Sequence, residues 1–594
     1  MNGHSVSGKK WILKKFNQEE ISFSKENFFI DEITAKLLSI RNIKKEDIKN
    51  FLNPSIKNFL PNPNSLLDME KSTLRTIEAI KNHEKVGIFG DYDVDGATST
   101  ALLGKYFEEL DLPYEIYIPD RKTEGYGPSI KGFKKLIDNK VSVIFTVDCG
   151  TLSFEAIEFA KNENIDVIVL DHHQSEINLP KAYSVINPNR IDDKSNLQYL
   201  CAAGVAFMFL VSINKQLRTI KWFEKYQKKE PNLLNYLDLV SLGTVCDVVP
   251  LIGLNRAIVK QGLKILKSKK NLGLKTLFDI CKIETSPSIY HLGYVLGPRI
   301  NAGGRVGKCS HGANLLLNSS PKETFKLAVE LDQFNKERQM IERDLLEKIL
   351  IQSKTNLKDP VLVLQGENWH EGVIGIVAAR LKDKFNKPTI IISINNNLGK
   401  ASARSIVGFD IGSVIIAATQ EKILLRGGGH KMAGGFSINV SNIQKFKEFV
   451  FNKFRGINID LSSERPLLLD SKIAPSAINL DFYNKVNILA PFGSGNPEPK
   501  FFVENLKPVN SKIVGEKHIK SVLIGSEGSS IKTIAFNAVD NELGAYLLKK
   551  KNNIFNIAGK LSLNEWRGQK NVEFIIDDIS VNKNHKIVVP SSIG

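Results

Sequence analysis

The sequence predicts an α/β protein: a parallel-sheet domain, a long connecting helix, a second α/β domain and a C-terminal β-barrel. Short β-branched runs such as VGIF, VSVIFTV and IDVIVL alternate with helical stretches from residue 85 to about residue 266, which is typical of βαβ units. Over residues 321–354 apolar positions recur at helical spacing with charges between them, which predicts the long helix. After about residue 467 short alternating runs with turn signals predict the barrel.

Length implies several domains, because 594 residues exceed what one hydrophobic core holds. Hydrophobic residues at 42% and charged residues at 24% are close to globular averages. We expect an N-terminal arm or cap over 1–75, the parallel-sheet domain over 76–320, the connecting helix over 321–355, the second α/β domain over 356–460 and the barrel over 465–585.

Charge and cysteine content narrow the class of protein. The formal charge of +17 favours a polyanionic partner such as nucleic acid or an anionic membrane surface, or simply a basic solvated surface. Five scattered cysteines without a C-x-x-C pair predict neither disulfides nor a zinc knuckle. The N-terminus lacks an apolar run, and the longest apolar stretch, 201–213, is too short to span a bilayer. We expect a cytoplasmic protein without a membrane partner.

Polar residues directly follow the predicted strands, at the edge where parallel sheets bind ligands. Asp91, Asp93 and Asp95 lie within five residues in GDYDVDG, and such carboxylates repel one another unless cations neutralise them. The alternative is an acidic turn that caps the helix starting near Ala97. An EF-hand is excluded, because the glycine is misplaced and no glutamate closes a twelve-residue loop.

Further candidates follow other apolar segments. They are Asp148 in VIFTVDCG, Asp171, His172 and His173 in VIVLDHH, and Asp247 in LDLVSLGTVCDVV. The last segment is either a strand or a helix leading into a loop. Taken singly, each residue is more often a cap or a structural residue. Together these carboxylates and imidazoles suit Mn²⁺ or Mg²⁺, and two ions about 4 Å apart can activate water and stabilise a leaving oxygen.

These motifs, in this order, resemble the DHH phosphoesterase superfamily and within it the RecJ branch. The resemblance covers most of the chain. It includes PDRKTEGYG (119–127), GPRINAGGR (297–305), EGVIGIVAARL (371–381), GGGHKMAGG (427–435) and PFGSGNPEP (491–499). Phe89 replaces a histidine that many members carry, DCG replaces the frequent DNG, and Gly303 replaces an alanine. None of these departures removes a carboxylate.

The resemblance implies roles for named residues. Two ions, Mn²⁺ or Mg²⁺, would be held by Asp91, Asp93, Asp95, Asp148, His172 and Asp247. Asp148 would bridge them, His173 would face the scissile phosphate, and Asp171 would orient the histidines.

Substrate-binding candidates come from the same motifs. They are Arg121, Arg299, Asn301, Arg305, Arg404, Ser405, Gly429 and His430. Arginine forms forked contacts to phosphates, although each of these arginines could equally be a surface ion-pair residue, and the glycines a plain turn. In the barrel, which resembles an OB-fold, Trp566 and Phe574 are candidates for base stacking or for the core.

The implied activity is a single-stranded-DNA-specific 5′–3′ exonuclease that releases mononucleotides in recombination and mismatch repair. We expect a monomer, with a single-strand-binding protein and a RecQ-type helicase as partners. One alternative is a DHH hydrolase of small nucleotides, and the predicted barrel argues against it. The other is a catalytically inactive replication scaffold, and the intact carboxylates argue against that.

Overall fold

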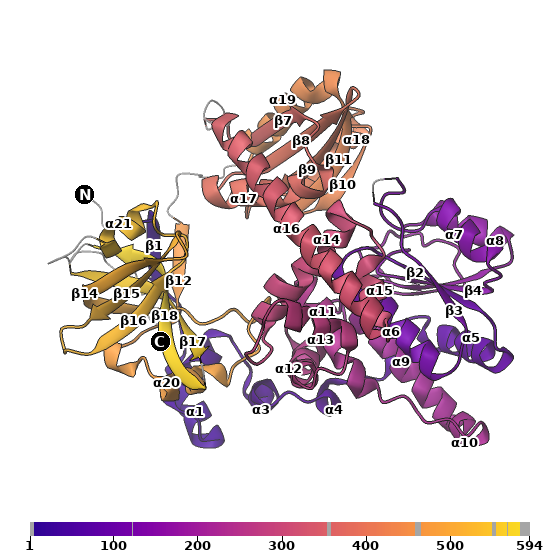
Figure 1. Ribbon diagram of the computed structural model, residues 1–594, viewed down its shortest axis with the longest axis horizontal. Coiled ribbons are helices and arrows are strands. Elements are labelled where there is room, and N and C mark those ends of the chain that lie inside the picture. The colour runs from indigo at the N-terminus through magenta and orange to yellow at the C-terminus, as the bar shows by residue number, and fades with distance from the viewer. Residues whose placement is uncertain are drawn as a thin grey trace.

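The computed structural model describes residues 5–121, 123–352, 358–457, 465–548, 554–566 and 568–581. Figure 1 shows a parallel-sheet domain with many helices, a second domain above it, and a β-rich domain at the opposite end of the long axis. The helix α16 (Pro321–Gln352) runs between the first two. The fold class predicted from the sequence is confirmed.

The parallel sheet has the strand order β3-β2-β4-β5-β6 with every neighbouring pair parallel. Its strands are β2 (Val86–Gly90), β3 (Tyr114–Tyr117), β4 (Val143–Val147), β5 (Asp166–Leu170) and β6 (Ser184–Ile186). Every residue of β2 and β4 is buried, which explains their continuous apolar runs. Strand order reverses between β2 and β4, so their carboxyl ends flank the crevice where open sheets bind ligands.

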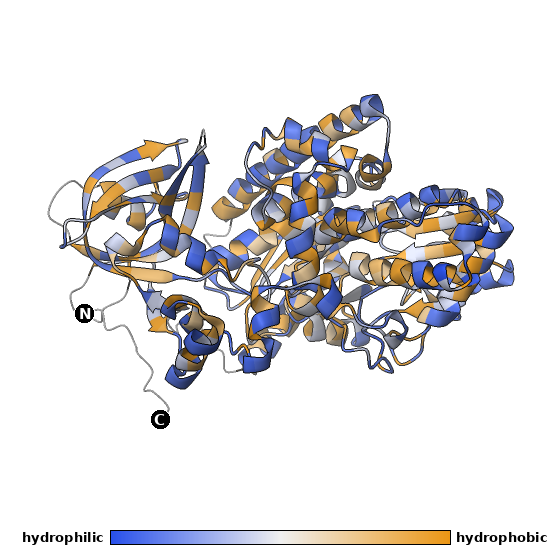
Figure 2. Ribbon diagram, turned by 90° about the horizontal axis from the view of Figure 1, so that it is seen from below, coloured by the Kyte–Doolittle hydropathy of each residue, from blue (hydrophilic) through white to orange (hydrophobic). Residues whose placement is uncertain are grey.

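Helices cover both faces of this sheet, and Figure 2 shows its apolar strands enclosed between helices. One core lies under α5, α6 and α9, and a second core lies under α7 and α8. The bounds are α5 (Met69–Asn82), α6 (Val94–Glu109), α7 (Ile130–Asp138), α8 (Phe154–Asn162) and α9 (Ala202–Thr219). None of the helices in the described ranges is long and apolar enough to cross a membrane.

The segment with two predicted alternatives, LDLVSLGTVC, is a helix, α11 (Leu237–Cys246), and Asp247 caps its carboxyl end. The helices that complete the domain are α10 (Trp222–Lys225), α12 (Gly253–Lys267), α13 (Leu272–Ile280), a π-helix (His291–Leu296), α14 (Gly297–Val306) and α15 (His311–Leu317).

The predicted connecting helix is confirmed as α16, and residues 353–355 of the predicted range lie outside the described residues. Ala328 and Leu331 belong to the core around α13 and α14, whereas Leu345 and Ile349 pack with α17 (Glu371–Phe385). One rigid element therefore belongs to the cores of both α/β domains.

The second domain is a mixed sheet of order β10-β11-β9-β8-β7, in which only β7 and β8 pair in parallel. Its strands are β7 (Leu362–Glu367), β8 (Thr389–Asn395), β9 (Leu398–Arg404), β10 (Arg426–His430) and β11 (Ala433–Asn439). The helices α18 (Ile411–Gln420) and α19 (Ile443–Arg455) pack on it together with α17.

The C-terminal domain is a barrel, because β14 pairs with β17 as well as with β15 and so closes the sheet β13-β14-β15-β16-β18-β17. Its elements are β12 (Arg465–Leu469), β13 (Ser471–Lys472), α20 (Leu480–Asn487), β14 (Phe501–Val514), β15 (His518–Ile524), β16 (Ser530–Ala535), α21 (Glu542–Leu548), β17 (Phe555–Trp566) and β18 (Gln569–Ser580).

The N-terminal segment is part of this barrel domain rather than a separate arm. Strand β1 (Lys9–Leu13) pairs in parallel with β12, and the buried Trp11 donates its indole N–H to Asp578 at 2.9 Å. Residues of α2 (Glu32–Ile40) and α3 (Ile48–Leu52) share a core with the barrel strands. Also in this segment are α1 (Gln18–Phe28) and α4 (Ile56–Phe59).

Arg256 on α12 joins three parts of the chain. Its guanidinium is 1% exposed and donates to the carbonyl oxygens of Phe51, Leu489 and Ala490 at 2.8–3.0 Å. Since a buried charge is stable only when its donors are satisfied, this contact fixes the parallel-sheet domain against the N-terminal segment and the approach to the barrel.

Candidate metal centre

The predicted ligands lie at the carboxyl ends of β2, β4 and β5 and at the end of α11. At the end of β4 the chain turns sharply: Asp148 has φ +61° and Gly150 has φ +115°. A Cβ on Gly150 would lie 2.4 Å from Thr146 Oγ1, so only glycine fits this turn. The DCG motif thus aims the Asp148 carboxylate back over the sheet edge.

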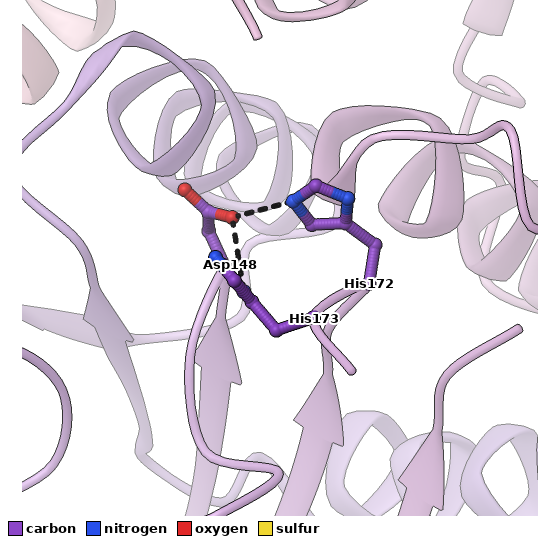
Figure 3. Close-up of side chains that lie close together, drawn as sticks. All are labelled: Asp148, His172 and His173. Atoms are coloured by element: carbon purple, nitrogen blue, oxygen red, sulfur yellow. Dashed lines mark ion pairs between the residues drawn. The ribbon is translucent and has the colours of Figure 1, made fainter. Parts of the chain in front are cut away.

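The structure brings all the predicted metal ligands together. Ligand atoms lie within 4.8 Å of one another in three groups: Asp91, Asp93 and Asp148; Asp148, His172 and His173; and Asp95, His172 and Asp247. His172 Nε2 is 3.3 Å from Asp148 Oδ1 and 3.6 Å from Asp247 Oδ2, and Figure 3 shows both histidine rings beside the Asp148 carboxylate. Asp148 and His172 each belong to two groups, so the three groups are connected.

The donor atoms fit cations. Asp91 Oδ1, Asp148 Oδ1 and His172 Nε2 are buried and have no hydrogen-bond partner in the described parts of the chain. A buried polar atom without a partner costs about 1–3 kcal/mol, and all three of these atoms come from residues of the connected ligand groups. Carboxylate oxygens with one imidazole nitrogen are the donor set that Mn²⁺ or Mg²⁺ accepts.

The carboxylates also destabilise one another without a cation. Burial, with repulsion from Asp93, raises the pKa of Asp91 and of Asp148 well above the usual range. Burial, with repulsion from Asp95 and Asp93, raises the pKa of Asp247 to about 8. Bound divalent ions would offset both the repulsion between the carboxylates and the cost of burying their charges.

Metal-free protein is therefore expected to lose stability as the pH rises from about 4 to about 8, because the folded state keeps a proton on Asp247 that the unfolded chain releases. Asp247→Asn should show a smaller loss than the wild type over the same interval. Melting temperatures measured in EDTA across this range test the difference. Equal pH dependence in the two proteins would contradict it, and Mn²⁺ should restore the wild type at the alkaline end.

Two of the aspartates also cap helices. Asp93 accepts from the backbone N–H of Gly96 at 3.0 Å, and Asp95 accepts from Ala202 and Ala203 at the start of α9. The helix-cap alternative is thus correct for Asp93 in addition to its place in the cluster. Each oxygen of Asp95 accepts one amide, so this residue anchors α9 beneath the centre, and it also belongs to the ligand group with His172 and Asp247.

Asp171 holds the turn that carries the two histidines. It accepts from the backbone N–H of Thr151 and of His172 and lies 2.8 Å from His173 Nδ1. Although burial opposes charge, this hydrogen bond raises the pKa of His173 to about 9 and lowers that of Asp171. The hydrogen bond to Asp171 thus favours a proton on His173 Nδ1.

Tyr126 is a site residue that sequence reasoning missed. Its hydroxyl donates to the carbonyl of Asp148 at 2.9 Å and lies 3.2 Å from His173 Nδ1. The available signal was its place in the PDRKTEGYG motif. The hydroxyl ties the loop after β3 to the turn that carries Asp148.

Arg121, Arg305 and Arg404 form a second, cationic cluster beside the metal centre. Burial and the nearby positive charge of Arg121, Arg338 and Arg404 lower the pKa of Arg305 to about 10. Arg305 donates to the Gly372 carbonyl at 2.9 Å, and the Arg121 guanidinium lies 5.4 Å from the Tyr92 ring centre. Among the described residues none of the three pairs with a carboxylate, so the cluster suits an anion held between the two α/β domains.

Other predicted substrate contacts are placed differently. Arg299 forms an ion pair with Asp332 at 2.9 Å, the ion-pair alternative considered for it. Asn301 is half-buried on α14. Ser405 is buried and donates to the Phe409 carbonyl.

The β10–β11 hairpin holds Gly429 and His430. A Cβ on Gly429 would lie 2.5 Å from the Ala433 carbonyl oxygen, so the hairpin itself requires glycine, whereas His430 is exposed. In the barrel Phe574 is completely buried and belongs to the core, so the stacking role considered for it is wrong. The side chain of Trp566 lies outside the described residues.

Comparison with known families matches three consecutive parts of the chain. Residues 85–244 match the DHH family, N-terminal domain, residues 358–456 the DHHA1 domain and residues 469–578 the RecJ OB domain. The chain is 34% identical over 544 residues to the single-stranded-DNA-specific exonuclease RecJ of Haemophilus influenzae, covering 89% of this chain and 93% of that protein. This chain belongs to the RecJ family.

Other RecJ proteins are also similar to this chain in sequence and in structure. The RecJ of Escherichia coli is 32% identical, with 89% of this chain and 92% of that protein covered. The crystal structure of RecJ from Thermus thermophilus in complex with Mn²⁺ superposes with a TM-score of 0.80 at 25% identity, covering 99% of this chain and 81% of that one. A second structure, exonuclease RecJ bound to manganese, has a TM-score of 0.56 at 29% identity over 67% of this chain and 98% of that one.

Proposed function

We propose that this RecJ-family protein is a metal-dependent exonuclease that degrades single-stranded DNA from its 5′ end and releases mononucleotides. The observation that carries the proposal is the convergence of unpartnered ligand atoms at Asp91, Asp148 and His172 beside an arginine cluster without carboxylate partners in the described ranges. The relatives named as single-stranded-DNA-specific exonucleases support it.

Asp91, Asp93, Asp148, His172 and Asp247 would hold the ions, with Asp95 anchoring α9 beneath them. Bound there, two divalent ions would lower the pKa of a water molecule and stabilise the charge of the leaving oxygen. His173 lies at the rim of the centre, with Nδ1 fixed by Asp171. It would donate a hydrogen bond from Nε2 to the phosphate under attack.

The arginine cluster would bind the terminal 5′ phosphate. Arg121 lies over the ring of Tyr92, which is the residue between Asp91 and Asp93. The arginine cluster therefore borders the metal centre. A terminal phosphate held so close to the scissile bond leaves room for a short product. That spacing supports release of single nucleotides.

The family resemblance supports a proposal for the cellular role. We propose action in the cytoplasm as a monomer in recombination and mismatch repair, with a single-strand-binding protein and a RecQ-type helicase as partners. The closed barrel at residues 469–578 argues against a hydrolase of small nucleotides, which would not require it. The complete ligand cluster argues against a catalytically inactive scaffold, which would not require metal ligands.

Digestion of end-labelled DNA tests the proposal. Single strands labelled at either end, with a 5′ phosphate or a 5′ hydroxyl, and matched duplexes are incubated with Mn²⁺, Mg²⁺ or EDTA. We expect labelled mononucleotide to appear first from the 5′ label, only with metal, faster with a 5′ phosphate and slowly from duplex. Release from the 3′ label first, activity in EDTA, or turnover confined to dinucleotides would each overturn it.

A further inference from the structure

Two tyrosines are stacked on each other at the surface beside the metal centre. The rings of Tyr290 and Tyr294 have centroids 5.5 Å apart and planes 24° apart, and the residues are 62% and 74% exposed. They lie at the π-helix His291–Leu296 that continues into α14. π-Helical turns are rare and are frequent at functional sites.

The opposite face of this π-helix is anchored. Leu292 and Leu296 are fully buried, and His291 Nδ1 accepts from the backbone N–H of Ser288 at 3.1 Å. In the ranges that the structure describes, no hydrogen bond involves either tyrosine hydroxyl. The pair is therefore presented to solvent by a fixed backbone, with ring faces and hydroxyls available to a ligand.

The π-helix packs directly against the end of α11. The Cys246 thiol donates to the Leu292 carbonyl at 3.4 Å, and a Cβ on Gly293 would lie 3.5 Å from Val245 Cγ1. Asp247 is the next residue along. It is followed by Val248, which is 68% exposed with φ +61°, a conformation that strains a β-branched residue. The π-helix that carries the tyrosines is thus in contact with the end of α11, where Asp247 follows.

A hollow lies close to the tyrosines along the chain. It has a volume of about 610 Å³, and its charged lining residues are Lys267, Lys269, Lys282, Asp279 and Glu284. Lys269 pairs with Asp279 at 3.2 Å, whereas Lys267 and Lys282 have no carboxylate partner among the described residues. The Phe278 ring lies 6.3 Å from that of His291, and the lining ends at Pro287, at most about 10 Å along the chain from Tyr290. In Figure 1 α12 and α13, which border this hollow, lie along the long axis between the parallel sheet and the barrel.

We propose that Tyr290 and Tyr294 form a stacking platform for nucleobases of the single strand that has yet to be cleaved, and that Lys267 and Lys282 of the nearby hollow contact its following phosphates. Aromatic rings beside lysines bind single strands of any sequence, because every base has a π-face. Paired bases cannot offer that face, so the platform favours unpaired DNA. The proposal rests on the proposed function and gives the strand a path from the metals toward the barrel.

The test compares Tyr290→Ala/Tyr294→Ala with Tyr290→Phe/Tyr294→Phe on strands of about 20 nucleotides, with normal bases or with abasic residues near the 5′ end. For normal bases we expect the alanine variant to raise KM about tenfold at similar kcat, and the phenylalanine variant to keep the wild-type KM. On abasic strands the wild type and the alanine variant should converge. Phe29→Ala, which removes an aromatic residue that is 94% exposed on the N-terminal segment, is the matched control.

Unchanged KM in the alanine variant, or an equal loss on normal and abasic strands, would overturn the platform. Dinucleotide turnover and melting temperature check that the variant is folded. Fluorescence anisotropy of the same strands without divalent metal measures Kd independently of cleavage. A wild type that binds but does not cut would refute the proposed function alone, while the effect of the alanine variant on Kd would still decide the platform.

Discussion

Asp148→Asn is expected to abolish nuclease activity, with a fall in kcat on the order of 10³-fold or more, because a ligand shared by both ions positions the whole reaction. Asp148 is the one carboxylate that belongs to two of the three ligand groups, and its Oδ1 has no hydrogen-bond partner among the described residues. Asparagine keeps the volume of the side chain and removes its charge. Initial rates on 5′-labelled single strands at saturating Mn²⁺, with calorimetric titration of Mn²⁺, measure the effect.

Asp238→Asn is the matched control for this prediction. Asp238 is also a buried carboxylate, on α11, where burial raises its pKa to about 6, but it lies outside the ligand groups. It should leave activity and Mn²⁺ binding unchanged. In EDTA at alkaline pH the Asp148→Asn protein should melt no lower than the wild type, because a charge that folding disfavours is gone. An Asp148→Asn protein within tenfold of wild-type activity would contradict the assigned role.

Trp11→Ala is expected to lower the free energy of unfolding of the barrel domain by about 4 kcal/mol, because truncation of a buried tryptophan leaves a cavity. The loss includes the indole donor to Asp578, a carboxylate that is 0% exposed. Urea unfolding and limited proteolysis measure the change. Activity on dinucleotides should persist while activity on long strands falls, because the metal ligands belong to another domain.

Trp11→Phe separates the two contributions. It fills part of the cavity and removes only the indole N–H, so we expect a smaller loss than for alanine. Lys9→Ala, on the same strand as Trp11, controls for disturbance of β1. If Trp11→Ala unfolded with wild-type stability, the N-terminal strand would not belong to the barrel domain as the pairing of β1 with β12 indicates.

Local pattern was sufficient for the sheet edge that carries the metal centre. The runs VGIF, VIFTV and VIVL are β2, β4 and β5, and their carboxylates and histidines follow at once. Parallel strands share one carboxyl edge, so residues that follow different strands must meet. The long helix α16 could also be predicted from the sequence, because its apolar positions recur over many turns.

Local pattern was insufficient wherever the partner of a residue is distant in the chain. LDLVSLGTVC suits a strand or a helix, and packing against the sheet domain selects the helix α11. Arg299 and Arg305 lie in one motif, yet Arg299 meets Asp332 while Arg305 lies close to Arg121 and Arg404. No property of the motif itself distinguishes the two arginines.

The sequence by itself therefore determined the fold class, the ligand residues that meet at the sheet edge and the family resemblance, because each depends on residues close together in the chain or on one shared strand end. Only the tertiary structure decided that the N-terminal segment completes the barrel through Trp11 and Asp578, that Arg256 joins three parts of the chain, and that Tyr290 and Tyr294 are exposed beside Asp247. Those relations join residues tens to hundreds of positions apart, and the free energy of such contacts is set by burial and partner geometry.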